Sequence, residues 1–167
     1  MQERGAAMSG VDKRELVRLL RFELAAEIEN LTRIALIARE AATHEEARPE
    51  NDKDTRSVEA AYLAGAQAER VRELERASVA LDRMQLRAFA EGESIALSAL
   101  VTVAGSKHRY FLASQGGGRR AQVSGVEVQV VTSASPLGEA LVGCAAGDVA
   151  EVQAASGMRR YEILAVE

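Results

Sequence analysis

The stretch VDKRELVRLLRFELAAEIENLTRIALIAREAAT (residues 11–43) contains neither glycine nor proline. Its apolar residues recur every three or four positions, which places their side chains on one face of an α-helix. These residues are Val17, Leu20, Leu24, Ile28, Leu31, Ala35 and Ala38. A long helix with one apolar stripe is unstable alone in water, because the stripe must be covered. The stretch therefore predicts a helix that packs against a second helix.

Residues 55–84 supply the second helix. Apolar residues return there at helical spacing, at Val58, Ala61, Ala64, Ala68, Val71, Leu74, Leu81 and Met84. Pro49 ends the first helix because it lacks a backbone donor and disfavours helix at the preceding residue. Asp54 is a good start for the second. We therefore expect residues 11–84 to form an antiparallel helical hairpin, whose arms of ~30 residues would each be about 45 Å long. Gly65 costs about 1 kcal/mol against alanine in mid-helix, which is tolerable if the partner helix approaches closely there.

The rest of the chain has the pattern of a small β-rich domain. Short β-prone runs at 99–104, 109–113, 126–132, 149–154 and 160–166 are separated by glycine-rich turns, and residues 114–120 (SQGGGRR) are expected to be a flexible loop. Residues 136–143 form one short predicted helix, with Pro136 in its first turn and Gly143 as its stop. The predicted fold class is α+β: a disordered leader at 1–10, the hairpin at 11–84, a linker at 85–94 and a half-open sheet at 95–167.

Composition excludes several classes of function. The formal net charge of −4 argues against wrapping nucleic acid, so no sequence-specific DNA binding is expected. Cys144 is the single cysteine, which rules out an intrachain disulfide. No run of about 18 apolar residues is present, so no membrane span is expected and a cytoplasmic location follows by default. No familiar catalytic motif occurs, and we do not expect the chain to be an enzyme by itself.

The turn between the two helices carries the strongest candidate site. Between residues 45 and 54 lie five carboxylates, at Glu45, Glu46, Glu50, Asp52 and Asp54, against Arg48 and Lys53. Carboxylate oxygens are hard ligands suited to Mg²⁺, but these are too few and too loosely arranged for a tight site. The plain alternative is a solvated acidic turn. A long stalk adds little core, so we interpret the turn as half of a site that another macromolecule completes.

The chain resembles the bacterial Gre factors, a family of transcript-cleavage factors that act on RNA polymerase. The most specific match is TSASPLGEALVGCAAGDVAEVQ (132–153) followed by GMRRYEILAVE (157–167), with a looser match at AERVRELE (68–75). The resemblance implies a C-terminal domain like that of FK506-binding proteins, which docks on the rim of the polymerase secondary channel. It also implies a hairpin that enters the channel and has indirect contact with the nascent RNA.

In that family two tip acids, spaced Asp-x-x-Glu, help to hold the second catalytic Mg²⁺, so that the polymerase hydrolyses backtracked RNA. The resemblance places the first acid on Glu50 and the second on Lys53, whose ammonium group cannot ligate a cation. Asp52 and Asp54 flank Lys53, so the candidate catalytic and Mg²⁺-binding residues are Glu50, Asp52 and Asp54. The candidate patch that contacts the polymerase is Ser135, Pro136 and Leu137. The structural alternative is that Pro136 only starts a helix and Leu137 packs inward.

Three other functions remain open at the level of the sequence. The first is a channel-binding regulator or inhibitor that does not support cleavage. The second is a peptidyl-prolyl isomerase or chaperone, for which the C-terminal half offers few aromatic side chains: Tyr110, Phe111 and Tyr161. The third is a coiled-coil assembly module, whose binding would depend on the base of the hairpin and not on its tip.

Overall fold

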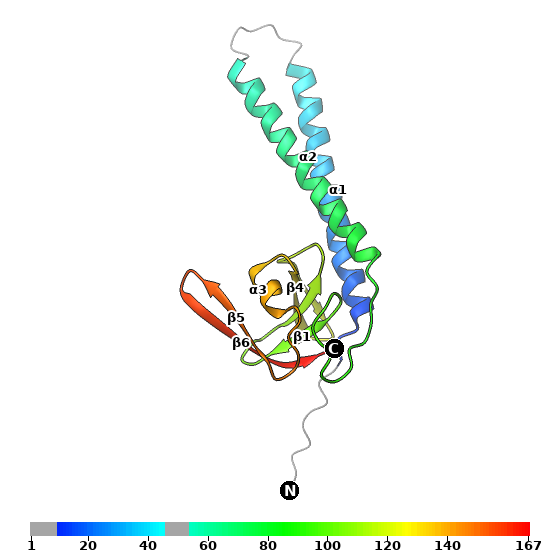
Figure 1. Ribbon diagram of the computed structural model, residues 1–167. Helices are drawn as coiled ribbons and strands as arrows, with labels where there is room; N and C mark the ends of the chain where they lie inside the picture. Colours follow the sequence, from blue (N-terminus) through cyan, green and yellow to red (C-terminus); the bar gives the residue numbers. More distant parts are fainter. Residues whose placement is uncertain (1–9, 46–53) are drawn as a thin grey trace.

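The computed structural model describes residues 10–45 and 54–167, apart from the side chains of residues 41–45 and 54–61. Helix α1 runs over Lys13–Glu45 and helix α2 over Asp54–Asp82. The backbone N–H of Arg14 donates a hydrogen bond to Asp12 Oδ1 at 2.8 Å, so the Asp12 side chain satisfies one free donor at the start of α1. The two helices lie side by side and project from a sheet domain (Figure 1), which confirms the predicted hairpin.

Packing along the hairpin is uneven. At its base, α1 buries Leu16, Leu20 and Leu24, and α2 buries Leu74, Ala77 and Leu81. The alanine-rich part of the stripe near the tip was expected to be slim and lightly packed, and Ala35 and Ala38 are indeed exposed. Large apolar side chains in this outer half are exposed too, at Ile34, Leu36, Ile37, Tyr62 and Leu63.

Gly65 lies in the same outer half, where the helices leave space between them. A Cβ atom added at Gly65 would meet no atom within 4 Å, so the close helix approach that would explain this glycine is absent. The base differs because a third element covers it.

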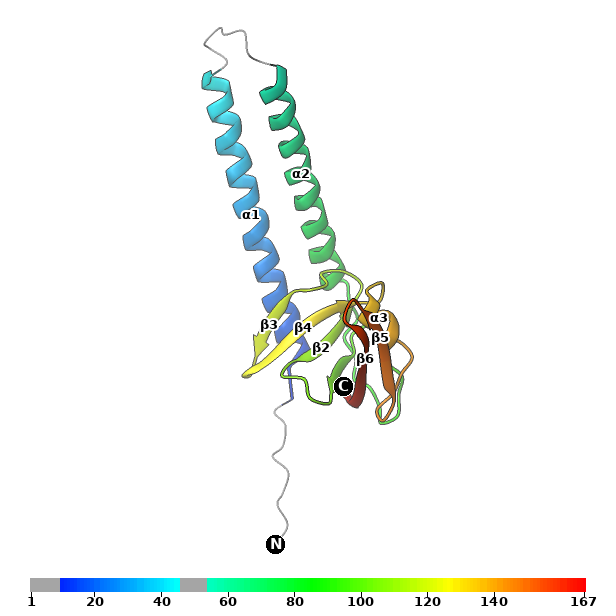
Figure 2. The same cartoon turned by 90° about the vertical axis from the view of Figure 1, so that its left-hand side faces the viewer.

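That third element is one face of a six-stranded sheet. The strands are β1 (Leu100–Val103), β2 (Arg109–Ala113), β3 (Arg120–Val123), β4 (Val126–Thr132), β5 (Val149–Ala154) and β6 (Gly157–Val166). Their order is β3-β4-β2-β1-β6-β5, and only the β2–β4 pair among the described strands is parallel. Figure 2 shows β3 and β4 against the base of α1.

Strand β3 is missing from the sequence-based prediction. Arg120 was assigned to a flexible loop, but it pairs with Gln129 at the start of an antiparallel β3–β4 hairpin. The strand has only four residues, and two of them are exposed, so it carries little apolar pattern. The predicted five strands are therefore six.

The sheet has a hydrophobic core on each face. One core joins Phe111, Val128 and Val130 to the buried leucines at the hairpin base, so the hairpin and the sheet share a single core. The other lies under helix α3 (Pro136–Leu141) and contains Tyr110, Leu112 and Leu141. Successive residues of β2 serve opposite cores, because side chains alternate across a strand. This arrangement fixes the root of the hairpin on the sheet.

Candidate functional site

The acidic turn falls largely outside the described residues. Glu50 and Asp52 lie beyond them, and Asp54 is described only as the first residue of α2, without its side chain. Among the described side chains, no group of three or more His, Cys, Asp or Glu residues is placed to hold a metal ion. The assignment of Glu50, Asp52 and Asp54 to Mg²⁺ therefore stays a prediction from the donor chemistry of carboxylates.

The second predicted patch, Ser135–Leu137, is well described and has a structural role. Ser135 caps α3: its Oγ accepts a hydrogen bond from Gly138 N at 3.1 Å and donates one to the Thr132 carbonyl at 2.7 Å. Pro136 is exposed, whereas Leu137 is half-buried against the core under α3. The structural alternative is confirmed, since Pro136 starts α3 and Leu137 packs inward, whereas contact of this patch with RNA polymerase stays a prediction.

Gly138 allows the turn to fold back tightly on itself. A Cβ atom at this position would lie 1.9 Å from the Thr132 carbonyl oxygen, far inside van der Waals contact. Only glycine lets the first turn of α3 approach the end of β4 so closely. The motif Ser-Pro-Leu-Gly therefore fixes where Pro136 is presented.

Pro136 stands at the edge of a groove of about 680 Å³, which we call the α3 groove. Its walls are the glycine-rich loop at 115–118, residues 129–131 of β4, the turn from Thr132 to Leu137, and the ribbon formed by β5 and β6. Arg159 and Tyr161 of β6 face into the groove, as do Gln115 and Gln129.

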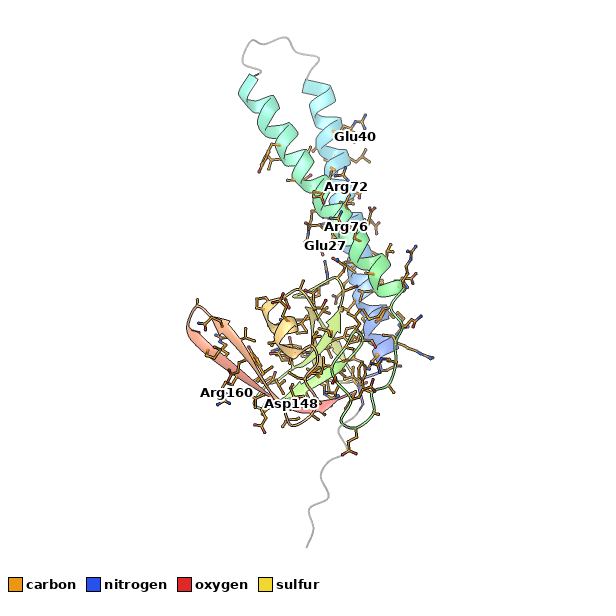
Figure 3. The ribbon with its side chains drawn as sticks, viewed as in Figure 1. Glu27, Glu40, Arg72, Arg76, Asp148 and Arg160 are labelled. Atoms are coloured by element: carbon orange, nitrogen blue, oxygen red, sulfur yellow. The ribbon has the colours of Figure 1, made fainter. Side chains whose placement is uncertain are left out.

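The glycine-rich loop also faces the hairpin, which sequence reasoning did not anticipate. Arg119, at the end of the loop, donates a hydrogen bond to Glu27 Oε2 of α1 at 2.5 Å. Arg70 of α2 donates to the other carboxylate oxygen, Glu27 Oε1, at 3.1 Å. Figure 3 labels Glu27 on the hairpin, near the sheet domain. Glu27 therefore links both helices to the loop that forms one wall of the α3 groove.

The electrostatics of this junction favour the charged form of Glu27. The hydrogen bond from Arg119 is the main cause that holds the pKa of the Glu27 carboxyl below its usual range; burial opposes it, and the hydrogen bond from Arg70 adds a smaller lowering effect. No sequence signal could have found this contact, since 92 residues separate Glu27 from Arg119.

Cys144 shows no sign of a reactive thiol. Burial raises the pKa of its thiol, with a smaller contribution from Asp148, so the group is less readily ionised than a free cysteine. Its Sγ–H donates to the Ala140 carbonyl at 3.3 Å.

Within the described ranges, no helix is long and apolar enough to cross a membrane.

The sequence similarity to known proteins is found mainly in the later part of the sheet domain, from β3 to β6. The sequence model described as "Transcription elongation factor, GreA/GreB, C-term" matches residues 121–167, from β3 to the end of β6. Residues 121–167 are therefore similar to the C-terminal segment of GreA and GreB. The predicted resemblance to the Gre factors is thereby confirmed, and the Gre-type segment holds Ser135, Pro136, Gly138 and the β5–β6 ribbon.

Individual relatives agree over a short length. "Transcription elongation factor GreA" of Verminephrobacter eiseniae (strain EF01-2) is 54% identical over 37 residues, which is 22% of this chain. The match spans about a quarter (23%) of the length of that relative.

Two solved structures align over most of the chain. The GreA factor homolog 1 (Gfh1) protein of Thermus thermophilus shares 18% identity with a TM-score of 0.34, covering 88% of this chain and 94% of that one. A second structure, of "the transcription factor Gfh1", shares 20% identity with a TM-score of 0.37 and covers 99% of each chain.

Proposed function

We propose that this protein is a transcription elongation factor that binds RNA polymerase at its secondary channel. The observation that carries the proposal is a Gre-type segment in a sheet domain whose core continues into the base of a long hairpin. The sheet domain would dock on the polymerase, and the hairpin would carry the acidic turn inward. The shared core supports these two roles, because close packing at the base fixes the direction of the hairpin relative to the docked domain.

The docking surface in this proposal is the α3 groove with Pro136 at its edge. Pro136 is exposed, and the Ser135 cap and the close approach of Gly138 fix its position without any need for a partner. A preformed edge of this kind loses little conformational entropy on binding. Arg159 and Tyr161 would supply the polar and aromatic contacts that are common in protein interfaces.

At the far end of the hairpin, Glu50, Asp52 and Asp54 would share a Mg²⁺ ion with the polymerase. The ion would polarise the RNA phosphate and help to generate the attacking hydroxide. The carboxylates of this chain would position the ion, and hydrolysis would take place in the catalytic site of the polymerase. Accordingly, the protein would act as an accessory factor.

A second function, regulation without cleavage, is favoured by one feature of the sequence. Lys53 lies between Asp52 and Asp54, at the position where the resemblance places the second acid. Its ammonium group repels a cation and offers no lone pair to it. A hairpin with this turn could occupy the channel and alter initiation or pausing without promoting RNA hydrolysis.

Binding to core RNA polymerase is the first experiment. The full chain should be retained by immobilised polymerase, and Pro136→Ala should weaken retention. The matched control is Val142→Ala, because Val142 is also an exposed apolar residue, close to the other end of α3. Equal retention of both variants would remove the α3 groove from the proposal, and no retention of the unaltered chain would reject polymerase binding.

A backtracked elongation complex with Mg²⁺ then separates the two functions. Shortening of the RNA above the intrinsic rate, lost when Asp52 and Asp54 are both changed to Asn, would establish support of cleavage. Under the regulatory alternative the RNA stays at its original length, but reversing the charges of Asp52 and Asp54 still changes pausing or initiation. Lys53→Glu places an acid at the position where this sequence differs from the Gre pattern. It should increase cleavage if the ion is bound there.

A further inference from the structure

The base of the hairpin carries a groove that the proposed function does not use. It lies between α1 and α2 and has a volume of about 490 Å³. A second hollow of about 620 Å³ meets it at Met84 and continues along the segment that follows α2. We call the two together the basal groove. Its floor is apolar, formed by Val17, Leu81, Met84 and Leu86.

The rim of the basal groove is positively charged. Arg14, Arg18 and Arg21 line the first hollow, and Arg83 and Arg87 line the second, whereas Asp82 is the single carboxylate in either wall. Asp82 pairs with Arg21 at 2.5 Å, and Arg87 pairs with Glu93. In the described part of the chain, Arg14, Arg18 and Arg83 have no carboxylate partner. A local excess of positive charge thus stands on a protein whose net charge is −4.

An aromatic side chain stands on the same rim. Phe22 is 73% exposed, one turn of α1 beyond Arg18, and Leu97 on the second hollow is 47% exposed. A large apolar side chain this exposed carries a cost in water that burial against a partner would remove. Exposed phenylalanine and arginine side chains around an apolar floor that includes a methionine are typical of the core of a protein interface.

We propose that the basal groove binds an acidic amphipathic helix of a partner protein. The apolar side of that helix would cover Phe22 and the floor between α1 and α2. Its carboxylates would pair with Arg14, Arg18 and Arg83, the arginines whose charge is not already compensated. Charge complementarity selects an acidic partner over a basic or neutral one.

The same features favour protein over nucleic acid. Binding of single strands needs a platform of aromatic side chains on which successive bases stack, and Phe22 is the single aromatic residue that lines the basal groove. The aliphatic floor suits leucine-like side chains spaced three and four residues apart on a helix.

A fluorescence-anisotropy titration tests the proposal on the full chain. The probe is a panel of labelled peptides of about 18 residues, roughly 27 Å long when helical, with leucines at helical spacing and glutamates on the flanks. We expect saturable binding that Phe22→Ala weakens by about 10-fold or more. Arg18→Glu should also weaken binding and should flatten its dependence on salt.

Matched controls distinguish binding at the basal groove from nonspecific binding. Met158→Ala removes another exposed apolar side chain, and Arg160→Glu reverses another exposed arginine. Both belong to the β5–β6 ribbon, and Figure 3 labels Arg160 well away from the hairpin base. Neither change should alter affinity, and all four variants should keep the thermal unfolding curve of the unaltered chain.

Several outcomes would overturn the proposal. They are no saturable binding by any peptide of the panel, equal binding of peptides with the same composition in scrambled order, and affinity that is unchanged in Phe22→Ala. Tighter binding of a single-stranded RNA oligonucleotide at the same residues would assign the groove to nucleic acid instead. Self-association in sedimentation equilibrium that Phe22→Ala abolishes would assign it to a second copy of this chain. Polymerase retention is measured separately, so its failure leaves this test intact.

Discussion

Arg119 donates a hydrogen bond to Glu27 Oε2 at 2.5 Å and so connects the glycine-rich loop of the sheet domain to the middle of α1. The Arg119 side chain is 18% exposed and that of Glu27 is 35% exposed, so solvent only partly screens the pair. Arg70 shares the same carboxylate. The hairpin is therefore tied to the sheet domain at a second level, beyond the apolar core at its base.

Replacing Glu27 with Gln should lower the free energy of unfolding by about 1 kcal/mol. The amide keeps one acceptor but loses the charge that strengthens both hydrogen bonds, and partial exposure limits the loss. Urea denaturation of the full chain measures the change. Glu29→Gln on the exposed side of α1 is the control, and an equal effect of both substitutions would show that the Arg119 contact contributes nothing to stability.

The same carboxylate makes stability depend on acidity. The pKa of Glu27 is lower in the folded protein than its ordinary value of 4.5, so the folded state binds the proton less readily than the unfolded state. The contribution of Glu27 is therefore complete above about pH 4.5 and is lost as pH falls through the folded pKa. The difference in unfolding free energy between the unaltered chain and Glu27→Gln should shrink between pH 7 and about pH 3. A difference that stays constant over this range would contradict the lowered pKa.

Gly138→Ala should destabilise the sheet domain by about 3 kcal/mol, because the new methyl group would collide with the Thr132 backbone. The colliding atom belongs to the main chain, so no side-chain rotation relieves the contact. Differential scanning calorimetry should show a marked fall in the melting temperature. An unchanged melting temperature would mean that the turn before α3 relaxes freely.

Gly65→Ala should have the opposite sign and raise the free energy of unfolding by up to about 1 kcal/mol. Gly65 is helical, its Cβ position is open, and alanine has the higher helix propensity. Helix content by circular dichroism should rise slightly in parallel. Destabilisation at this position would reveal a close helix contact absent from the described hairpin.

Ser135→Ala should cost about 1 kcal/mol, since α3 loses its cap and Gly138 N loses its acceptor. Ser133→Ala in the same turn is the matched control, because Ser133 is exposed and its side chain makes no hydrogen bond to any described residue. Chemical denaturation distinguishes the two variants. Indistinguishable midpoints would limit Ser135 to a role in partner binding.

Local patterns predicted the helices and most strands, because each depends on neighbours in the sequence. The glycine- and proline-free run gave α1 to within two residues at each end, and α2 ends two residues before the predicted Met84. Strand β3 escaped because Arg120–Val123 alternates over too few residues and follows a run of glycines. The light packing of the outer half followed from its alanine-rich stripe, because small side chains bury little area, whereas the cover that the sheet gives to the base could not be seen in the helical pattern.

The site was less accessible to sequence reasoning than the fold. The place of Pro136 in the first turn of α3 was predicted from a contiguous motif, whereas the capping role of Ser135 is seen only in the structure. The partnership of Glu27 with Arg119 and the grouping of Arg18 with Met84 in the basal groove arise only when distant segments meet. The roles of Glu50, Asp52 and Asp54 in holding Mg²⁺ remain predictions.

The hairpin is supported at its base only, because burial is high there and low in the outer half. Its root is held by leucines that belong to the same core as the sheet, whereas the side chains of α1 at residues 32–40 are all exposed. A sideways load on the outer end would bend this thinly packed part and leave the base unchanged. The outer part of the hairpin can thus be deflected while its base keeps its position on the sheet.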